Sequence, residues 1–154
     1  MASDAKRLLD GAGRRRVVDA IGAAEVRSHG EIRVHLEDTV RGGDPVARAR
    51  KVFEKLGMTA TERRNGVLVY VAVKDRQFAV VGDSGIHAKV AEGFWDDVAA
   101  ARGRRFAAGE FADGLAEAIG RLGDALAAHF PRAADADVDE LPDSISYEGD
   151  PAEE

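Results

Sequence analysis

The chain has 154 residues, a formal net charge of −6 and no cysteine. Its length is that of a single domain with a stable core, and the lack of cysteine excludes disulfides, thiolate nucleophiles and thiolate-ligated metal sites. No apolar run approaches the roughly 18 residues of a membrane span, and the N-terminal residues contain no apolar signal core. We therefore expect a cytoplasmic protein, and a monomer.

Charge is distributed unevenly along the chain. Residues 131–154 contain nine acidic residues and one basic residue, whereas the residues before them are close to neutral. An acidic segment competes with phosphate for basic patches, which argues against nucleic-acid binding. We divide the chain into a folded domain, residues 1–131, and an acidic C-terminal tail, residues 132–154, that is expected to be partly docked or disordered.

The first elements in chain order are a helix and a strand. Residues 5–28 have the apolar spacing of a helix, with a break expected near Gly11. Residues 31–37 alternate strictly between apolar and polar, which is typical of a strand with one buried face. Its apolar side is Ile32, Val34 and Leu36, and its polar side is Glu31, Arg33, His35 and Glu37. The pattern predicts a half-buried strand near a sheet edge.

A second helix and a pair of strands follow. Asp44 can cap a helix with Pro45 in its first turn, and that helix ends at Gly57. Residues 67–73 are seven consecutive apolar residues, as expected of a strand covered on both faces. A charged turn separates this strand from a second apolar strand, residues 78–82. The two strands are expected to form an antiparallel hairpin.

The remaining elements are helical. After Gly85 one helix is predicted, with Ile86, Val90, Phe94 and Val98 on its apolar side. The strongest periodic pattern follows it and ends at Pro131; its members are Phe111, Leu115, Ile119, Leu122, Leu126 and Phe130. Because strands alternate with helices, the sequence predicts an α/β fold. Its expected form is a three-layer α/β/α sandwich with a small mixed sheet of three or four strands.

Three short motifs resemble those of a known family. They are Asn65-Gly66-Val67-Leu68, Asp75-Arg76 and Phe106-x-x-Gly109-x-Phe111-x-x-Gly114-Leu115. Together with the order of the elements they look like the TPM domain, which is named after thylakoid-lumen, photosystem II repair and acetylcholine-receptor modulator proteins. The resemblance covers about residues 8–131. The chain resembles a stand-alone bacterial member, because it shows neither a signal peptide nor a membrane helix.

The resemblance has implications for fold and chemistry. It implies a three-layer α/β/α fold and the binding of calcium or another divalent metal by acidic loop residues. For plant members it also implies an acid-phosphatase activity. Asp75 and Asp83 both become candidate metal ligands through it, and the sequence does not choose between them.

One candidate site lies where two strands end. If strand 31–37 runs parallel to strand 67–73, then Glu37, Asp38 and Asp75 meet at the carboxyl end of the sheet, where open α/β sheets collect ligands. Such an oxygen cluster suits Ca²⁺, which takes about 6–8 oxygen ligands. A solvated hairpin turn explains Asp75 and Arg76 equally well.

The competing site is the turn Gly82-Asp83-Ser84-Gly85. A strand end, a glycine turn and a helix start expose backbone N–H groups, which attract anions. Asp83 can bind a metal there or cap the helix, and capping is the favoured interpretation. If the two strands form an antiparallel hairpin, this turn lies at the opposite end of the sheet from Asp75. The four histidines, His29, His35, His87 and His129, show no metal-ligand spacing, so surface positions are expected for them.

Two functions from different classes follow. The first is a non-enzymatic interaction module in which Ca²⁺ or Mg²⁺ fixes the loops for an unidentified protein partner. The second is a metal-dependent acid phosphatase acting on phosphomonoesters, with Asp75 or Asp38 holding the metal that polarises a phosphoryl oxygen. Phosphoryl transfer needs positive groups around the phosphate, and only Arg76 is close in sequence. The shortage of cations favours the module.

Overall fold

The structure, a computed structural model, describes residues 11–28, 30–40, 43–60, 64–75, 77–90, 93–101, 111–130 and 145–147. In chain order the elements are α2 (Gly11–Glu25), β1 (Glu31–Glu37), α3 (Pro45–Lys55), β2 (Gly66–Ala72), β3 (Gln77–Gly82), α4 (Ser84–His87), α5 (Phe94–Ala101), α7 (Phe111–His129) and β4 (Ile145–Tyr147). Asp75 and Asp83 therefore flank β3, whereas Arg76 lies outside the described residues.

The four strands form one mixed sheet in the order β3-β2-β1-β4. β1 runs parallel to β2 over its full length, with Glu31 opposite Gly66 and Glu37 opposite Ala72. β2 and β3 form the expected antiparallel hairpin. The predicted α/β fold with a small mixed sheet is confirmed.

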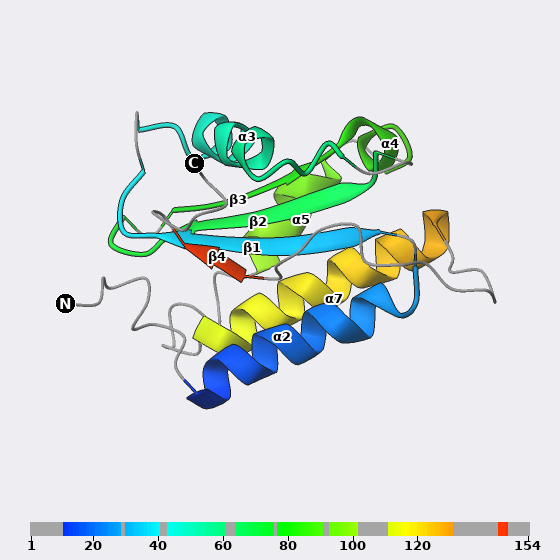
Figure 1. Ribbon diagram of the computed structural model, residues 1–154, viewed down its shortest axis with the longest axis horizontal. Helices are drawn as coiled ribbons and strands as arrows, with labels where there is room; N and C mark the ends of the chain where they lie inside the picture. The colour runs from blue at the N-terminus through cyan, green and yellow to red at the C-terminus, as the bar shows by residue number, and fades with distance from the viewer. Residues whose placement is uncertain are drawn as a thin grey trace.

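Helices cover both faces of this sheet (Figure 1). α3 lies on one face, over an apolar cluster to which β2 contributes Leu68, Tyr70 and Ala72. α2, α5 and α7 cover the other face, against a larger cluster that includes Val67, Val69 and Val71 of the same strand. Successive residues of β2 thus enter opposite cores, which explains its continuous apolar sequence. In the part of the chain that the structure describes, no helix has both the length and the apolarity to cross a membrane.

Local sequence determines where α3 begins. The Asp44 carboxylate accepts hydrogen bonds from the backbone N–H groups of Val46 at 3.0 Å and Ala47 at 3.3 Å, and Pro45 occupies the first turn. These contacts satisfy donors that have no partner inside the helix. The predicted cap of this helix is confirmed.

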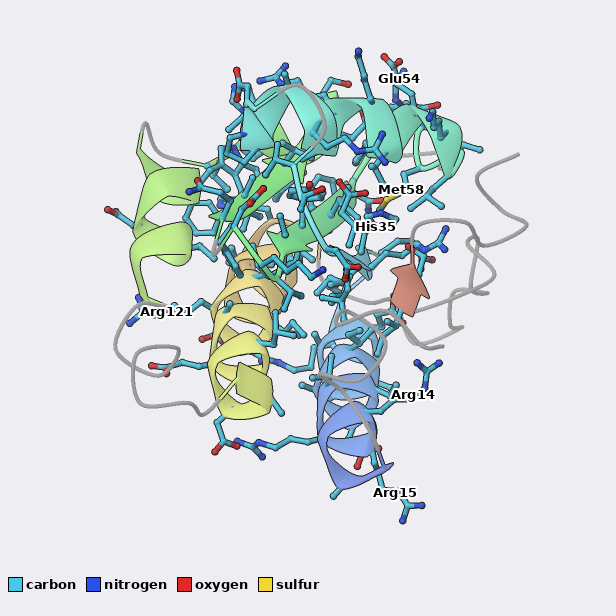
Figure 2. All side chains as sticks on the ribbon, turned by 90° about the vertical axis from the view of Figure 1, so that its left-hand side faces the viewer. Arg14, Arg15, His35, Glu54, Met58 and Arg121 are labelled. Atoms are coloured by element: carbon cyan, nitrogen blue, oxygen red, sulfur yellow. The ribbon has the colours of Figure 1, made fainter. Side chains whose placement is uncertain are left out.

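The prediction that β1 is half-buried was wrong. All seven of its residues are buried, and the strand lies next to the sheet edge, between β2 and β4. β4 pairs with it in parallel, with His35 opposite Ser146. His35 is 0% exposed and lies between α3 and the layer of α2 and α7 (Figure 2), so its expected surface position is also wrong.

The helix predicted after Gly85 is two helices. α4 contains four residues and α5 begins at Phe94. Gly93, directly before α5, has a φ of +82°, a left-handed conformation that glycine adopts without strain. The apolar spacing from Ile86 to Val98 therefore continues across a break in the helix. Phe106 and Gly109 of the sequence motif, and all but residues 145–147 of the tail, lie outside the described residues.

Candidate functional site

The carboxyl ends of β1 and β2 bring three predicted site residues to one end of the sheet. The parallel pairing extends past both strands, because the N–H groups of Val73 and Lys74 donate to the carbonyls of Glu37 and Asp38, each at 2.8 Å. The Asp75 carboxylate accepts a hydrogen bond of 2.7 Å from the backbone N–H of Val40. Glu37, Asp38 and Asp75 therefore lie at the same end of the sheet.

Glu37 is the buried member of this group, and its carboxylate is fully engaged. Arg48 donates to it twice, from Nε at 2.9 Å and from Nη2 at 2.8 Å. The Tyr70 hydroxyl donates to Oε2, and Nε2 of His35 lies 3.1 Å from Oε1. Both oxygens are occupied inside the protein, so the arrangement fits a structural anion rather than a metal ligand.

The surroundings of Glu37 change its acidity and that of Tyr70. Burial by itself would raise the pKa of Glu37, but hydrogen bonds from His35, Arg48 and Tyr70 and the charge of Arg48 lower it to about 2. Burial, followed by the hydrogen bond to the Glu37 carboxylate, raises the pKa of Tyr70. Glu37 is thus held ionised, and Tyr70 is held protonated as its hydrogen-bond donor.

His35 connects Glu37 to the C-terminal strand. Its Nδ1 lies 2.9 Å from the Ser146 hydroxyl oxygen of β4. With the proton on Nε2, the ring donates to Glu37 and accepts from Ser146. Sequence reasoning did not find Arg48, Tyr70 or Ser146 as parts of this network. A signal for Arg48 existed: it lies beside Ala49 and four residues before Val52, within the apolar side of α3.

Asp38 and Asp75 are more accessible than Glu37. Asp38 is half-buried and Asp75 is exposed. Within the residues that the structure describes, no group of three or more acidic or histidine side chains is arranged to hold a metal ion. An ion at this end of the sheet would thus need water and backbone carbonyls to complete its coordination.

Asp83 lies at the opposite end of the hairpin. Gly82 pairs with Val67 near the start of β2, whereas Gln77 pairs with Ala72 at its end. The Asp83 carboxylate caps α4 by accepting from the N–H of Ser84 at 2.7 Å, and it accepts from Nε of Arg64 at 2.8 Å. The structure therefore separates Asp75 from Asp83, as the hairpin logic predicts, and gives Asp83 the capping role.

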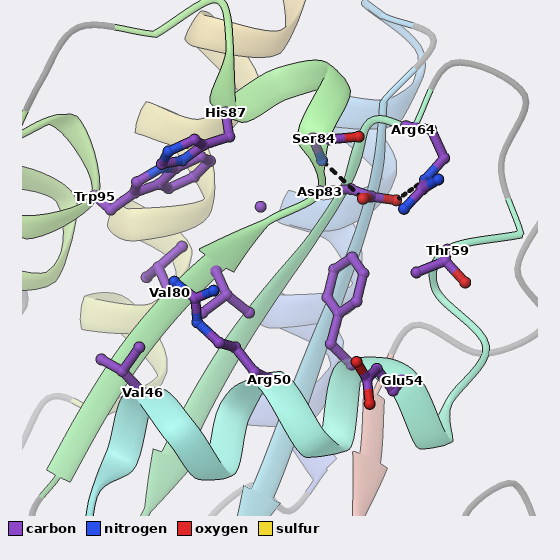
Figure 3. A pocket seen from close by; sticks show the side chains of 13 residues that line it. Val46, Arg50, Glu54, Thr59, Arg64, Val80, Asp83, Ser84, His87 and Trp95 are labelled. Carbon is purple, nitrogen blue, oxygen red and sulfur yellow. Dashed lines mark hydrogen bonds and ion pairs between the residues drawn. The ribbon is translucent and has the colours of Figure 1, made fainter.

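A cavity of about 500 Å³ opens beside Asp83 (Figure 3). α3 contributes Arg50, Phe53 and Glu54 to it, and the end of β3 contributes Val80 and Val81. His87 and Trp95 form one wall, where the indole N–H of Trp95 donates to Nδ1 of His87 at 2.9 Å. The cavity combines apolar, aromatic and charged lining residues, which is typical of small-molecule sites.

Comparison with known proteins identifies the family. A sequence model of the TPM domain matches residues 2–125. The chain belongs to the TPM domain family. No curated protein matches the chain.

Solved structures show the same fold. The BA42 protein from the psychrophilic bacterium Bizionia argentinensis is 45% identical, with a TM-score of 0.82 over 90% of this chain and 94% of that one. The N-terminal domain of a P. gingivalis protein is 19% identical, with a TM-score of 0.64 over 85% and 90% of the two chains. The N-terminal domain of the cg2496 protein from Corynebacterium glutamicum is 14% identical, with a TM-score of 0.60 over 76% and 73%. These last two likenesses concern the fold alone.

Proposed function

We propose that this TPM domain is a divalent-metal-binding interaction module that holds Ca²⁺ or Mg²⁺ where β1 and β2 end. Asp38 and Asp75 would supply the carboxylate oxygens. The ion would fix the two loops that follow these strands and so shape a surface for a protein partner. A cytoplasmic location and a monomeric state remain expectations from the sequence.

The tie between the two loops carries this proposal. The hydrogen bond from the Val40 N–H to Asp75 ties the turn after β2 to the loop after β1, and the bond from the Lys74 N–H to the Asp38 carbonyl holds the same two segments together. Two acidic residues thereby belong to neighbouring loops in the part of the fold where ligands of open α/β sheets bind. Oxygen donors of this kind suit the hard cations Ca²⁺ and Mg²⁺.

The same geometry sets the expected strength of binding. Glu37 and Asp83 already accept hydrogen bonds at both carboxylate oxygens, so they do not fit as ligands without rearrangement. Two protein carboxylates completed by water form a site of low charge, for which we expect a dissociation constant of about 10⁻⁴–10⁻³ M. Such an ion exchanges readily and responds to changes in metal concentration.

A calcium titration of the full chain, followed by amide chemical shifts, tests this site. We expect saturable shifts confined to residues 38–40 and 73–75. Asp75→Asn should weaken the binding about tenfold or more, because a charged ligand is lost. Asp97→Asn, an exposed position on α5, is the matched control and should leave the affinity unchanged. Shifts confined to Asp83, or no shift at millimolar calcium, would overturn the proposal.

Phosphatase activity is the alternative, and the engagement of Arg48 speaks against it. Arg48, which lies at this end of the sheet, directs two hydrogen bonds to Glu37 rather than to a position for phosphate. We expect purified protein with magnesium or calcium to leave p-nitrophenyl phosphate unhydrolysed. Turnover that is abolished by Asp75→Asn would replace the module with the phosphatase.

A further inference from the structure

We propose that the cavity beside Asp83 is a second binding site, which takes a small aromatic anion. The ring of the ligand would lie against Trp95, and its carboxylate, phosphate or phosphonate group would bind Arg50. Neither the proposed metal nor the acidic residues at the other end of the sheet take part. The inference therefore stands or falls independently of the metal site.

The aromatic wall of this cavity is held rigidly. The Trp95 ring contacts Phe94 edge-on, with centroids 5.0 Å apart and planes at 77°. It also lies against Gly82, where a Cβ atom would come within 2.4 Å of the indole Cη2. Together with the hydrogen bond to His87, these contacts fix the ring before any ligand arrives. A preorganised surface lowers the entropy lost on binding.

His87 extends this wall and adds a donor. Its ring lies nearly parallel to that of Trp95, at an interplanar angle of 3°. Since the indole N–H can only donate, Nδ1 of His87 must carry the lone pair, and the proton of the neutral ring is on Nε2. The His87–Trp95 pair thus offers a flat apolar surface with one N–H donor.

Charge on the rim selects an anion. Arg64 is paired with Asp83 at 2.8 Å, whereas the described residues provide no ion-pair partner for Arg50. Figure 3 shows the Arg50 side chain extending toward Val80, on the side of the cavity where Trp95 and His87 lie, and Glu54 on the other side. An anionic group beside Trp95 would meet the guanidinium of Arg50 and avoid the carboxylate of Glu54.

The size of the cavity favours a small molecule. Its volume of about 500 Å³ falls in the range of roughly 300–1,000 Å³ typical of ligand pockets. Val80, Val81 and Phe53 line the cavity and offer apolar contact to a ring. An anion without a ring would leave these residues and the Trp95 face unused, so ring and charge should both be needed.

The chain contains a single tryptophan, so its fluorescence reports directly on this cavity. We would titrate the full chain with phenylphosphonate in the absence of divalent metal and follow both the emission of Trp95 and its indole N–H resonance. We expect a saturable change in both signals. Inorganic phosphate carries the charge alone and benzyl alcohol carries the ring alone. Each should bind at least about tenfold more weakly than phenylphosphonate.

Two substitutions on adjacent residues of α3 localise the anionic group. Arg50→Gln should weaken phenylphosphonate binding about tenfold, because a charge-assisted hydrogen bond is lost. Lys51→Gln removes the same charge from an exposed neighbour that does not line the cavity, and it should leave the affinity unchanged. Circular dichroism checks that both variants are folded.

Several outcomes would overturn the inference. The absence of a saturable Trp95 signal with the unsubstituted chain would do so without recourse to any variant. Equal losses in Arg50→Gln and Lys51→Gln would reduce the effect to net charge. Binding of inorganic phosphate as tight as that of phenylphosphonate would remove the role assigned to the aromatic wall.

Discussion

The two ends of the sheet use the same residue types for different purposes. At the carboxyl end of β1, Glu37 and Arg48 are buried and satisfy each other, with Tyr70 and His35 completing the network. The cavity that reaches Asp83, at the opposite end, is lined by an exposed arginine instead: Arg50, on the side where Trp95 lies. A charged side chain therefore indicates a binding site only where the fold leaves it accessible, and paired burial indicates a structural role.

The largest expected effect tests the structural role of the buried pair. Arg48→Met keeps a long side chain but leaves the Glu37 carboxylate buried without its main partner, which should lower the free energy of unfolding by about 3–5 kcal/mol. Urea denaturation measures this change. Arg50→Met, on the same helix but exposed, should change stability by about 0.5 kcal/mol or less.

A double-mutant cycle sharpens the same test. Replacing both Glu37 and Arg48 by apolar residues removes the uncompensated charge, so the double variant should be more stable than the sum of the single changes implies. If Arg48→Met and Arg50→Met destabilise the chain equally, the distinction between the two ends is wrong.

The acidity of Glu37 predicts a dependence of stability on pH. Its pKa is about 2 in the folded chain, against an ordinary value of 4.5, so the unfolded chain binds a proton more readily. The stabilisation is therefore complete above about pH 4.5 and is lost as the pH falls toward about 2. The difference between the two pKa values corresponds to about 3 kcal/mol of folding stability. Urea denaturation at several pH values measures the difference in the free energy of unfolding between the unsubstituted chain and Glu37→Gln. This difference should become smaller as the pH falls through that interval. A difference that stays constant would contradict the prediction.

A smaller effect is expected at the other end of the sheet. In Gly82→Ala the new methyl group would meet Trp95 at 2.4 Å and Ile86 at 2.9 Å, which should cost about 1–3 kcal/mol and displace the indole. A change in Trp95 emission, together with the urea midpoint, measures both. Gly120→Ala on α7 is the control: nothing lies within 4 Å of its added Cβ, so we expect a neutral or stabilising change of up to about 1 kcal/mol. An unchanged emission in Gly82→Ala would mean that the aromatic wall is not fixed by this contact.

The apolar periodicity of the sequence predicted the strands and the burial of their apolar side chains, but not the burial of the polar ones. The alternation in β1 correctly placed Ile32, Val34 and Leu36 in an apolar core. The continuous apolar run in β2 correctly indicated a strand that is covered on both faces. The same alternation placed His35 and Glu37 on a solvent-facing side. That inference failed because their partners, Arg48 on α3 and Ser146 on β4, are brought to them by tertiary structure, which a local pattern does not contain.

The candidate sites divide in the same way. Hairpin logic separated Asp75 from Asp83, since it needs only the order of two adjacent strands. Capping chemistry was sufficient to favour a structural role for Asp83, because the Ser84 N–H is its immediate neighbour. The ion pair with Arg64 and the wall formed by His87 and Trp95 depend on how α4 and α5 pack on the end of β3, and no spacing in the sequence encodes that.

The position of β4 has a consequence for how the chain is made. Ser146 meets His35 across 111 residues of sequence, so during synthesis β1 emerges from the ribosome long before the strand that pairs with it. Until about residue 147 has emerged, one side of β1 lacks its native neighbour, although β2 and β3 are already present. The sheet can thus be completed only after β4 has emerged, and until then a nascent chain of this protein exposes an unpaired strand edge of the kind that chaperones protect.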